Sequence, residues 1–345
     1  MSVQSSTSPA AKPSASAAVS TSVAAGASAK PAASASAKPA GSAAASGAAA
    51  AGASAAAKPA GQVYSFDAQD YSFAGPATIE GGLVTLQLKN AGKELHHLQL
   101  LKFNDNVTAD QVIGAMASGN PESVFRFVSA VGGVGAIDPT GTAQVTENLQ
   151  PGQYLLACFI PSPSDGIAHA AKGMVKPLTV TAAPAGQPAA SPSAAATVTL
   201  KDFSFDSPAT FNAGQVTIKV DNAGPQIHDM SVIKLAQGKQ VQDALNFLQA
   251  VSAPPPPVAA SGSVSSSGAS GSVTVGTSSV AAKPAAGGPP PFQDVGGING
   301  LSQGLSGWAN VNFTAGDYAF ICNVPDPSSG KPHWALGMSK GFSVK

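Results

Sequence analysis

Hydrophobic and polar residues alternate along much of the chain from residue 70 onward. Leu83, Thr85 and Gln87 alternate with Val84, Leu86 and Leu88, and the stretch from Val216 to Val220 shows the same period of two. This period predicts half-buried β-strands, and an Asn-Ala-Gly turn follows both stretches. Two windows instead favour helices. Thr108 and Gln111 form a capping box ahead of an apolar run, and the second window has apolar residues at i, i+3, i+4 and i+7, namely Val241, Ala244, Leu245 and Leu248.

The whole strand pattern occurs twice. The segment DYSFAGPATIEGGLVTLQLKNAGKELHHLQLL from residue 70 lines up with DFSFDSPATFNAGQVTIKVDNAGPQIHDMSVI from residue 202, and NLQPGQYLLACFIP (148–161) lines up with NFTAGDYAFICNVP (312–325). The pattern of each copy predicts about seven or eight short, mostly antiparallel strands and one inserted helix. This combination is typical of a Greek-key β-sandwich. We therefore expect an all-β fold with copy 1 at residues 61–182, a linker at 183–196 and copy 2 at 197–345.

Two segments have too few hydrophobic residues to form a core. Residues 1–60 consist mainly of Ala, Ser, Gly, Pro and Lys, without an aromatic or acidic residue. This composition predicts a disordered tether. Within copy 2, residues 252–291 are filled with Ser and Gly between proline runs, which predicts a disordered low-complexity insertion.

The charge of the chain disfavours several classes of partner. The formal net charge is zero and 10% of the residues are charged, so neither nucleic acid nor an acidic membrane surface is favoured as a partner. The sequence contains no run of 18 apolar residues, so it predicts no transmembrane segment. The residues after Met1 do not show the charged and apolar regions of an export signal. An Ala/Ser/Pro tether ahead of small β domains nevertheless favours a periplasmic, secreted or cell-surface protein, held to the cell envelope by its N-terminal segment.

A cysteine, a histidine and a methionine recur at the same intervals in both copies. Cys158 is followed by His169 and Met174, and Cys322 by the corresponding two residues, eleven and sixteen positions later in each case. Strand alternation turns each cysteine inward, on the same face as Tyr154 or its counterpart. Because the two cysteines lie in separate cores, we expect their Cα atoms to be more than about 7 Å apart, too far for a disulfide.

The repeat also aligns His96 with His228, each of them at the start of a strand and predicted to point inward. His97 and its counterpart Asp229 are predicted to point outward. Taken singly, a Cys, Met or His is more often structural, but the repeated set favours a metal. Two imidazoles, one thiolate and a weak thioether are the ligands of a blue-copper electron-transfer site.

Each copy resembles the cupredoxins, the plastocyanin-like type 1 copper proteins. The resemblance rests on the Asn-Ala-Gly turn followed by His, on Gly-x-Tyr-x-x-x-Cys, and on His followed five residues later by Met. It implies one copper in each copy, with these ligands: His96, Cys158, His169 and Met174 in copy 1, and His228, Cys322, His333 and Met338 in copy 2. It also implies electron exchange with a redox partner protein through the exposed edge of His169 or His333. The Cys-to-His loop is several residues longer than in plastocyanin or azurin.

The sequence does not favour an enzyme. The chain has five histidines, too few for the trinuclear cluster of a multicopper oxidase, and neither cysteine has the neighbouring histidine of copper nitrite reductase. No catalytic triad, phosphate loop or HExxH motif is present. Two alternatives to electron transfer stay open, a copper-binding or storage protein and a metal-free cupredoxin-like surface module. Tyr154 and Tyr318 are expected to be structural anchors, and Trp334 either shields the metal, faces a partner or packs in the core.

Overall fold

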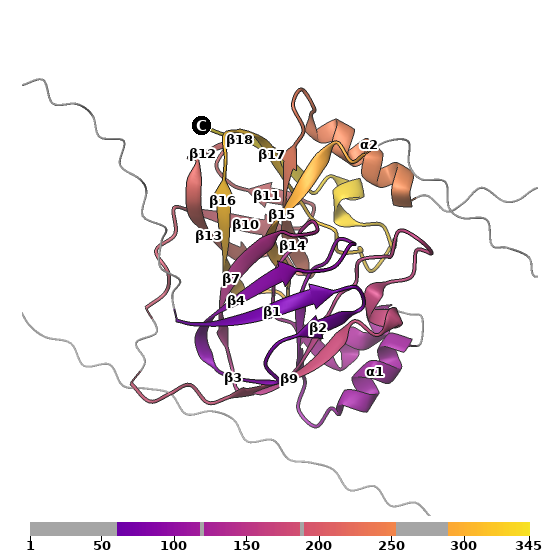
Figure 1. Ribbon diagram of the computed structural model, residues 1–345, viewed down its shortest axis with the longest axis vertical. Coiled ribbons are helices and arrows are strands. Elements are labelled where there is room, and N and C mark those ends of the chain that lie inside the picture. Colours follow the sequence, from indigo (N-terminus) through magenta and orange to yellow (C-terminus); the bar gives the residue numbers. More distant parts are fainter. Residues whose placement is uncertain (1–60, 118–120, 187–189, 253–288) are drawn as a thin grey trace, which may run out of the picture. The chain divides into compact units, whose positions relative to one another are not determined.

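The computed structural model describes residues 61–117, 121–186, 190–252 and 289–345, all within one compact unit (Figure 1). The predicted tether at 1–60 and most of the predicted insertion at 252–291 lie outside these ranges. No helix in the described ranges is long and apolar enough to cross a membrane.

Copy 1 is a sandwich of two sheets. The first contains, in spatial order, β2 (Ser72–Ala74), β1 (Gln62–Gln69), β4 (Gly82–Asn90) and β7 (Thr142–Leu149). The second contains β3 (Thr78–Glu80), β9 (Val175–Thr181), β8 (Gly152–Ala157), β5 (Gln99–Phe103) and β6 (Val128–Ala130). The helical elements are α1 (Ala109–Ala117) and the 3-10 helices η1 (Pro121–Arg126) and η2 (His169–Lys172).

Copy 2 repeats this order of strands. Its first sheet contains β11 (Ser204–Asp206), β10 (Ala196–Lys201), β13 (Gly214–Asn222) and β16 (Ser306–Phe313), and its second β12 (Thr210–Phe211), β18 (Ser339–Val344), β17 (Gly316–Ile321), β14 (His228–Leu235) and β15 (Phe292–Leu301). The helical elements are α2 (Val241–Ser252) and η3 (His333–Leu336). The predicted all-β fold of two sandwiches, each with one inserted α-helix, is therefore confirmed. The exact limits of the two copies and the linker stay predictions.

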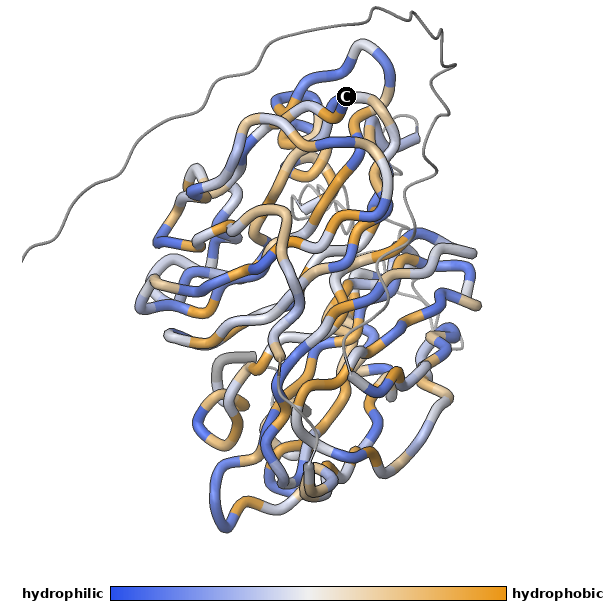
Figure 2. The backbone as a smooth tube through the Cα atoms, turned by 90° about the vertical axis from the view of Figure 1, so that its left-hand side faces the viewer, coloured by the Kyte–Doolittle hydropathy of each residue, from blue (hydrophilic) through white to orange (hydrophobic). Residues whose placement is uncertain are grey.

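Strand alternation sorts the side chains of β8 and β17 into two cores. Tyr154, Leu156 and Cys158 lie in the core between the sheets, whereas Leu155 and Ala157 pack on the outer face with residues of α1. In copy 2 the outer face of β17 packs with α2, and Trp334 belongs to that cluster. Trp334 is therefore a packing residue. The tube in Figure 2 shows the hydrophobic and hydrophilic stretches that follow one another along the strands.

Local hydrogen bonds confirm two of the sequence predictions. The Thr108 amide donates to Gln111 Oε1 at 2.8 Å and the Gln111 amide donates to Thr108 Oγ1 at 3.3 Å, which is the predicted capping box of α1. The buried Tyr154 hydroxyl donates to the Gln150 carbonyl at 2.6 Å, and the Tyr318 hydroxyl donates to the carbonyl four residues earlier at 3.0 Å. Both tyrosines therefore anchor the turn ahead of their own strand, as expected.

The two copies join along equivalent segments. Strands β7 and β16 pair antiparallel with Val145 opposite Ala309, so that the first sheets of the two copies form one sheet of eight strands. The segments 131–137 and 295–301 also pair with each other, with Val134 opposite Ile298. Because Val145 corresponds to Ala309 and Val134 to Ile298 in the repeat, each copy uses the same surface for the join.

Candidate metal centres

The His and Cys side chains predicted as ligands in copy 1 converge at one point. His96 Nδ1 lies 3.1 Å from His169 Nδ1, and Cys158 Sγ lies 3.4 Å from His169 Nδ1. The three side chains are fully buried and their ligand atoms all lie within 4.8 Å of one another. Residues 73 positions apart in the sequence therefore meet as predicted.

Copy 2 forms the same group. His228 Nδ1 lies 3.0 Å from His333 Nδ1, and Cys322 Sγ lies 3.3 Å from His333 Nδ1 and 3.9 Å from His228 Nδ1. These three side chains are also fully buried. The two groups are the places in the described part of the chain where three metal-binding side chains converge.

The methionines adjoin the groups through the backbone. The Met174 amide donates to the His169 carbonyl at 2.9 Å, and the Cys158 amide donates to the Met174 carbonyl at 3.2 Å. Met338 makes the same two bonds with His333 and Cys322, at 2.9 and 3.2 Å. Both methionine side chains are fully buried in the core that contains the cysteines. Each methionine thus lies beside its cysteine along the backbone, and its role as the weak axial ligand stays a prediction.

The long loop between Cys and His folds back on itself in both copies. In copy 1 the Ser162 amide donates to the Ile167 carbonyl at 2.9 Å, and the His169 amide donates to the Ile160 carbonyl at 2.9 Å. In copy 2 the His333 amide donates to the Val324 carbonyl at the same distance. The extra residues therefore form a short closed turn that returns the histidine to the cysteine.

The first histidine of each group is oriented by an aspartate. His96 Nε2 lies 3.1 Å from Asp70 Oδ1, and His228 Nε2 lies 2.8 Å from Asp202 Oδ1. Gly92 of the Asn-Ala-Gly turn packs against this pair, because a Cβ there would come within 2.6 Å of His96 Nε2. Burial raises the pKa of Asp70, but hydrogen bonds from the Lys93 amide and from His96 outweigh it, so the net pKa is lowered. Asp70 is therefore a carboxylate that can only accept.

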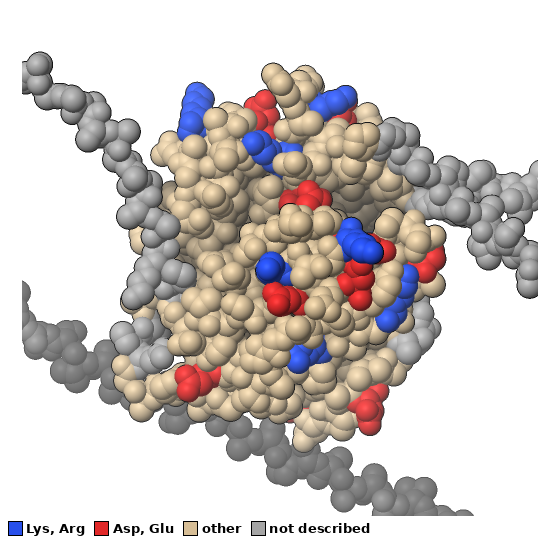
Figure 3. All heavy atoms as spheres, in the orientation of Figure 1, with Lys and Arg blue, Asp and Glu red and all other residues tan. Residues whose placement is uncertain are grey.

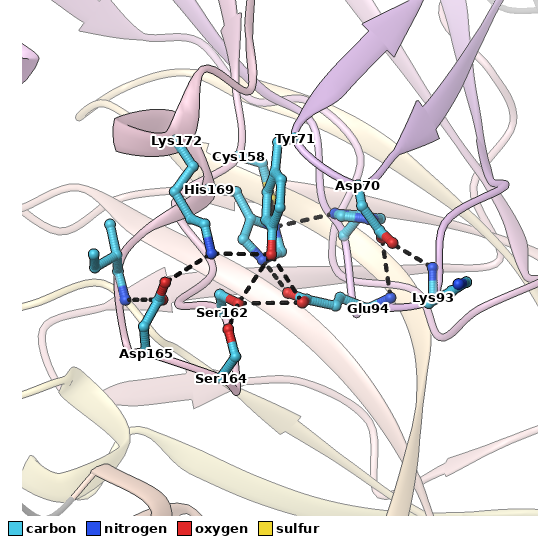
Figure 4. A network of polar contacts seen from close by, with 12 residues as sticks. Asp70, Tyr71, Lys93, Glu94, Cys158, Ser162, Ser164, Asp165, His169 and Lys172 are labelled. Atoms are coloured by element: carbon cyan, nitrogen blue, oxygen red, sulfur yellow. Dashed lines mark hydrogen bonds and ion pairs between the residues drawn. The ribbon is translucent and has the colours of Figure 1, made fainter. Parts of the chain in front are cut away.

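The second histidine of each group is oriented by the residue two positions before the first. His169 Nε2 lies 2.8 Å from Glu94 Oε2, and His333 Nε2 lies 2.9 Å from Gln226 Oε1. In Figure 4 the hydroxyl groups of Tyr71 and Ser162 contact Glu94, and Lys172 donates in turn to the Tyr71 hydroxyl. His169 and His333 are both 0% exposed, so the expectation that an exposed histidine edge serves as the electron port is wrong. In copy 1 the long loop between Cys158 and His169 and the side chain of Tyr71 cover the imidazole of His169. The ring of Tyr71 lies edge-on to this imidazole, with 5.3 Å between the ring centroids.

These partners decide which ring nitrogen carries the proton. In copy 1 both Nε2 atoms face carboxylates, which accept hydrogen bonds, so Nε2 of each ring must donate. Both Nδ1 atoms then present lone pairs to each other at 3.1 Å, which is unfavourable without a cation between them. Three donors at about 2.0 to 2.3 Å from one ion lie roughly 3.5 Å apart, so the group fits a bound metal.

The thiols are protonated until a metal displaces the proton. Burial raises the pKa of Cys158 to about 11. The pKa of Cys322 is also raised, by burial and by the nearby charge of Asp229. Burial lowers the pKa of His333 to about 4, so this ring stays neutral and able to bind a metal. Metal binding at either centre should therefore release the thiol proton.

His97 and Asp229 were predicted to point outward into solvent, but other residues cover both side chains. His97 is half-buried, and its Nε2 accepts a hydrogen bond from the Phe159 amide at 2.8 Å. Burial lowers the pKa of His97 to about 3, which keeps this nitrogen free to accept. Asp229 is 3% exposed and its Oδ1 accepts from the Asn323 amide at 2.7 Å. Both side chains hold the residue that follows the cysteine.

The face of the molecule drawn in Figure 3 shows little concentration of charge. On the face in Figure 3, Lys and Arg alternate with Asp and Glu among mostly uncharged atoms, without a large patch of one sign among the described residues. This distribution agrees with the zero net charge of the sequence.

Fold and site together make each copy a cupredoxin-like domain, with a buried His-Cys-His group beside a methionine. The chain is similar to a dithionite-reduced auracyanin from the photosynthetic bacterium Roseiflexus castenholzii, at 21% identity over 36% of this chain and 98% of that one, with a TM-score of 0.24. It is similar to auracyanin B at 25% identity over 36% of this chain and 91% of that one, TM-score 0.24. A multicopper oxidase matches at 12% identity over 82% of this chain and 88% of that one, TM-score 0.21. No protein-family model and no curated protein matches the chain.

Proposed function

We propose that the protein transfers electrons through a type 1 copper centre in each copy. The observation that carries this proposal is the buried convergence of one thiol and two Nδ1 lone pairs, with a methionine beside them. Copper bound there would supply a one-electron couple between Cu(I) and Cu(II). The soft thiolate and thioether suit the reduced ion, and the imidazoles suit both.

The hydrogen bonds around each His-Cys-His group support a role in electron transfer and not a purely structural metal site. Cys, His and Met are linked through backbone amides, and each imidazole is fixed at Nε2 by a second residue. Donors held in this way cannot rearrange when the charge of the ion changes, so little reorganisation accompanies the electron. Full burial also excludes water as a further ligand.

Electrons would cross the residues that cover the second histidine. The ring of Tyr71 lies edge-on to His169 in copy 1, and the ring of Phe203 lies 5.3 Å from His333 in copy 2. Both aromatic residues have positive φ, 67° and 61°, which non-glycine residues adopt at a cost of about 1–2 kcal/mol. The turn between the first two strands of each copy is thus held in a strained form that places a ring on the ligand.

Partner, location and absence of catalysis are part of the same proposal. We propose a redox partner protein outside the cytoplasm, with the N-terminal segment acting as a tether to the cell envelope. The support is the composition of residues 1–60. A catalytic role is not proposed, because four of the five histidines belong to the two centres and the fifth, His97, accepts a backbone hydrogen bond.

Absorption spectroscopy tests the proposal. Purified protein with added Cu(II) should show an intense thiolate charge-transfer band in the red. Cys158→Ala or Cys322→Ala should each remove the part that belongs to one copy, and the double variant should remove all of it. Voltammetry should then show reversible one-electron waves. A colourless protein would overturn copper binding, and a coloured but redox-inert one would favour copper storage.

A further inference from the structure

The two centres differ at the residue that touches the second histidine. Residue 94 of copy 1 aligns with residue 226 of copy 2, and both contact Nε2 of the matching imidazole with nearly equal geometry, at 2.8 and 2.9 Å. The contact atom belongs to a carboxylate in Glu94 and to a neutral amide in Gln226. Geometry is thus conserved between the copies while charge is not.

A second exchange in the loop accompanies the first. Ser162 of copy 1 aligns with Asp326 of copy 2. Ser162 Oγ lies 3.1 Å from Glu94 Oε1, whereas Gln226 Nε2 donates to Asp326 Oδ1 at 3.2 Å. Each copy therefore has one acidic and one neutral residue in this pair. In copy 1 the acidic residue, Glu94, contacts the imidazole directly, whereas in copy 2 the acidic residue, Asp326, contacts the neutral Gln226 instead.

The surrounding hydrogen bonds fix both side chains in these roles. Glu94 Oε1 accepts from the Tyr71 hydroxyl at 3.0 Å (Figure 4). The Glu94 side chain is 17% exposed. In copy 2, donation by Gln226 Nε2 to Asp326 leaves Oε1 of the amide to face His333. Both imidazoles therefore donate from Nε2, to a charged acceptor in copy 1 and to a neutral one in copy 2.

A charged acceptor at Nε2 makes the opposite nitrogen of an imidazole a stronger donor to a metal. The resulting gain in metal-binding free energy is larger for Cu(II) than for Cu(I), because Cu(II) has the higher charge. We propose that Glu94 raises the preference of the copy 1 centre for Cu(II) over Cu(I), and that Gln226 leaves the copy 2 centre without this effect. Glu94 and Gln226 are thus positioning residues that set the reduction potentials of the centres separately. This inference rests on the proposed electron-transfer function.

Reciprocal substitutions at residues 94 and 226 test this proposal, with the copper centre of the other copy removed so that only one reduction potential is measured at a time. Glu94→Gln is made in a Cys322→Ala background, and Gln226→Glu in a Cys158→Ala background. The double exchanges Glu94→Gln with Ser162→Asp, and Gln226→Glu with Asp326→Ser, reproduce the pair of the other copy and avoid two adjacent carboxylates. Glu80→Gln is the matched control, because Glu80 is an exposed carboxylate of copy 1. A redox titration followed at the charge-transfer band reads each potential.

Glu94→Gln should lower the preference of its centre for Cu(II) about tenfold, which raises the one-electron potential by about 59 mV. Gln226→Glu should shift its own centre by a similar factor in the opposite direction, and Glu80→Gln should shift neither. Coloured centres with unchanged potentials in both exchanges would overturn this inference and leave the proposed function intact. Loss of the band in Glu94→Gln and in its double exchange would also overturn it, because Glu94 would then be required for the centre. A colourless unmodified protein would overturn both.

Discussion

His97 and Asp229 occupy matching positions and fix the residue after each cysteine. The Phe159 amide donates to His97 Nε2, and the Asn323 amide donates to Asp229 Oδ1. His97→Ala should leave the Phe159 amide without a partner next to the buried Cys158, which lowers the free energy of unfolding by about 1–3 kcal/mol. Chemical denaturation of the metal-free protein measures this change.

The conservative variant separates the hydrogen bond from the imidazole itself. His97→Gln offers an amide oxygen at about the position of Nε2 to the same backbone donor and should recover most of the lost stability. Asp229→Ala should destabilise copy 2 in the same way through the Asn323 amide. Equal stability of His97→Ala and the unmodified protein would show that the hydrogen bond contributes nothing to the fold.

The ligands could be predicted residue by residue, but their supports could not. Cys158, His169 and their counterparts recur at identical spacing, so the repeat itself identified them. The prediction of exposure for His97 and Asp229 failed because the outer face of their sheet is covered. Alternation holds in β14, where Met230 and Val232 lie in the core between the sheets and Ile233 packs with residues of α2 on the outer face. The sequence period assigns a side chain to a face but does not show what covers that face. Glu94 and Gln226 gave no signal because the two copies have different chemical groups at this position.

At the scale of elements, η2 connects two of the predicted ligands. It begins at His169 and ends on Gly173, whose φ of 103° lies in the left-handed region that favours glycine. Gly173→Ala should lower the free energy of unfolding by about 1–2 kcal/mol. The strain should also move Met174 relative to Cys158 and alter the absorption of the copper-loaded protein in a Cys322→Ala background.

A glycine in a regular helix provides the control. Gly114 lies in α1, and a Cβ there would have no atom within 4 Å. Gly114→Ala should therefore leave the spectrum unchanged and stabilise the protein slightly, because alanine favours a helix. If Gly173→Ala behaved like Gly114→Ala in both measurements, the turn would not constrain the methionine.

Regular elements were predictable because their sequence periods are clear. The strands β4 and β13 and the capping box of α1 each appear where the pattern predicts them. Burial does not alternate throughout, because both faces of β4 are buried from Leu83 to Leu86. The segments 131–137 and 295–301 were not predictable as paired strands. Each has two consecutive glycines and no run of alternating large side chains, and its partner is the equivalent segment of the other copy, far away in the sequence.

At the scale of the whole molecule, the join between the copies contains carboxyl groups with raised pKa values. Glu147 in β7 is 2% exposed; its Oε1 accepts from the Gly133 amide at 2.6 Å, and its Oε2 has no hydrogen-bond partner in the described structure. Burial raises the pKa of Glu147 to about 8. Burial and the nearby Asp138 likewise raise the pKa of Asp294 to about 8. The neutral form of each group therefore predominates in the folded protein at pH 7.

These groups should make the join sensitive to pH. The pKa of Glu147 is higher in the folded state than the ordinary value of 4.5 for a glutamate, so between about pH 4.5 and 8 the folded state binds more protons than the unfolded state. The stability that depends on the neutral group is fully present below pH 4.5 and is lost as the pH rises through about 8. Asp294 changes stability in the same direction.

Glu147→Gln should remove this contribution while keeping an acceptor for the Gly133 amide. Between pH 6 and 8 the free energy of unfolding of the unmodified protein should fall more steeply than that of the variant, by at most roughly 1 kcal/mol per pH unit. Denaturant unfolding of the metal-free protein at several pH values gives both slopes. Glu80→Gln, at an exposed carboxylate of copy 1, should leave the slope unchanged. Parallel slopes for the unmodified protein and Glu147→Gln would mean that water or a rearranged side chain already solvates Glu147, and that the join tolerates its charge.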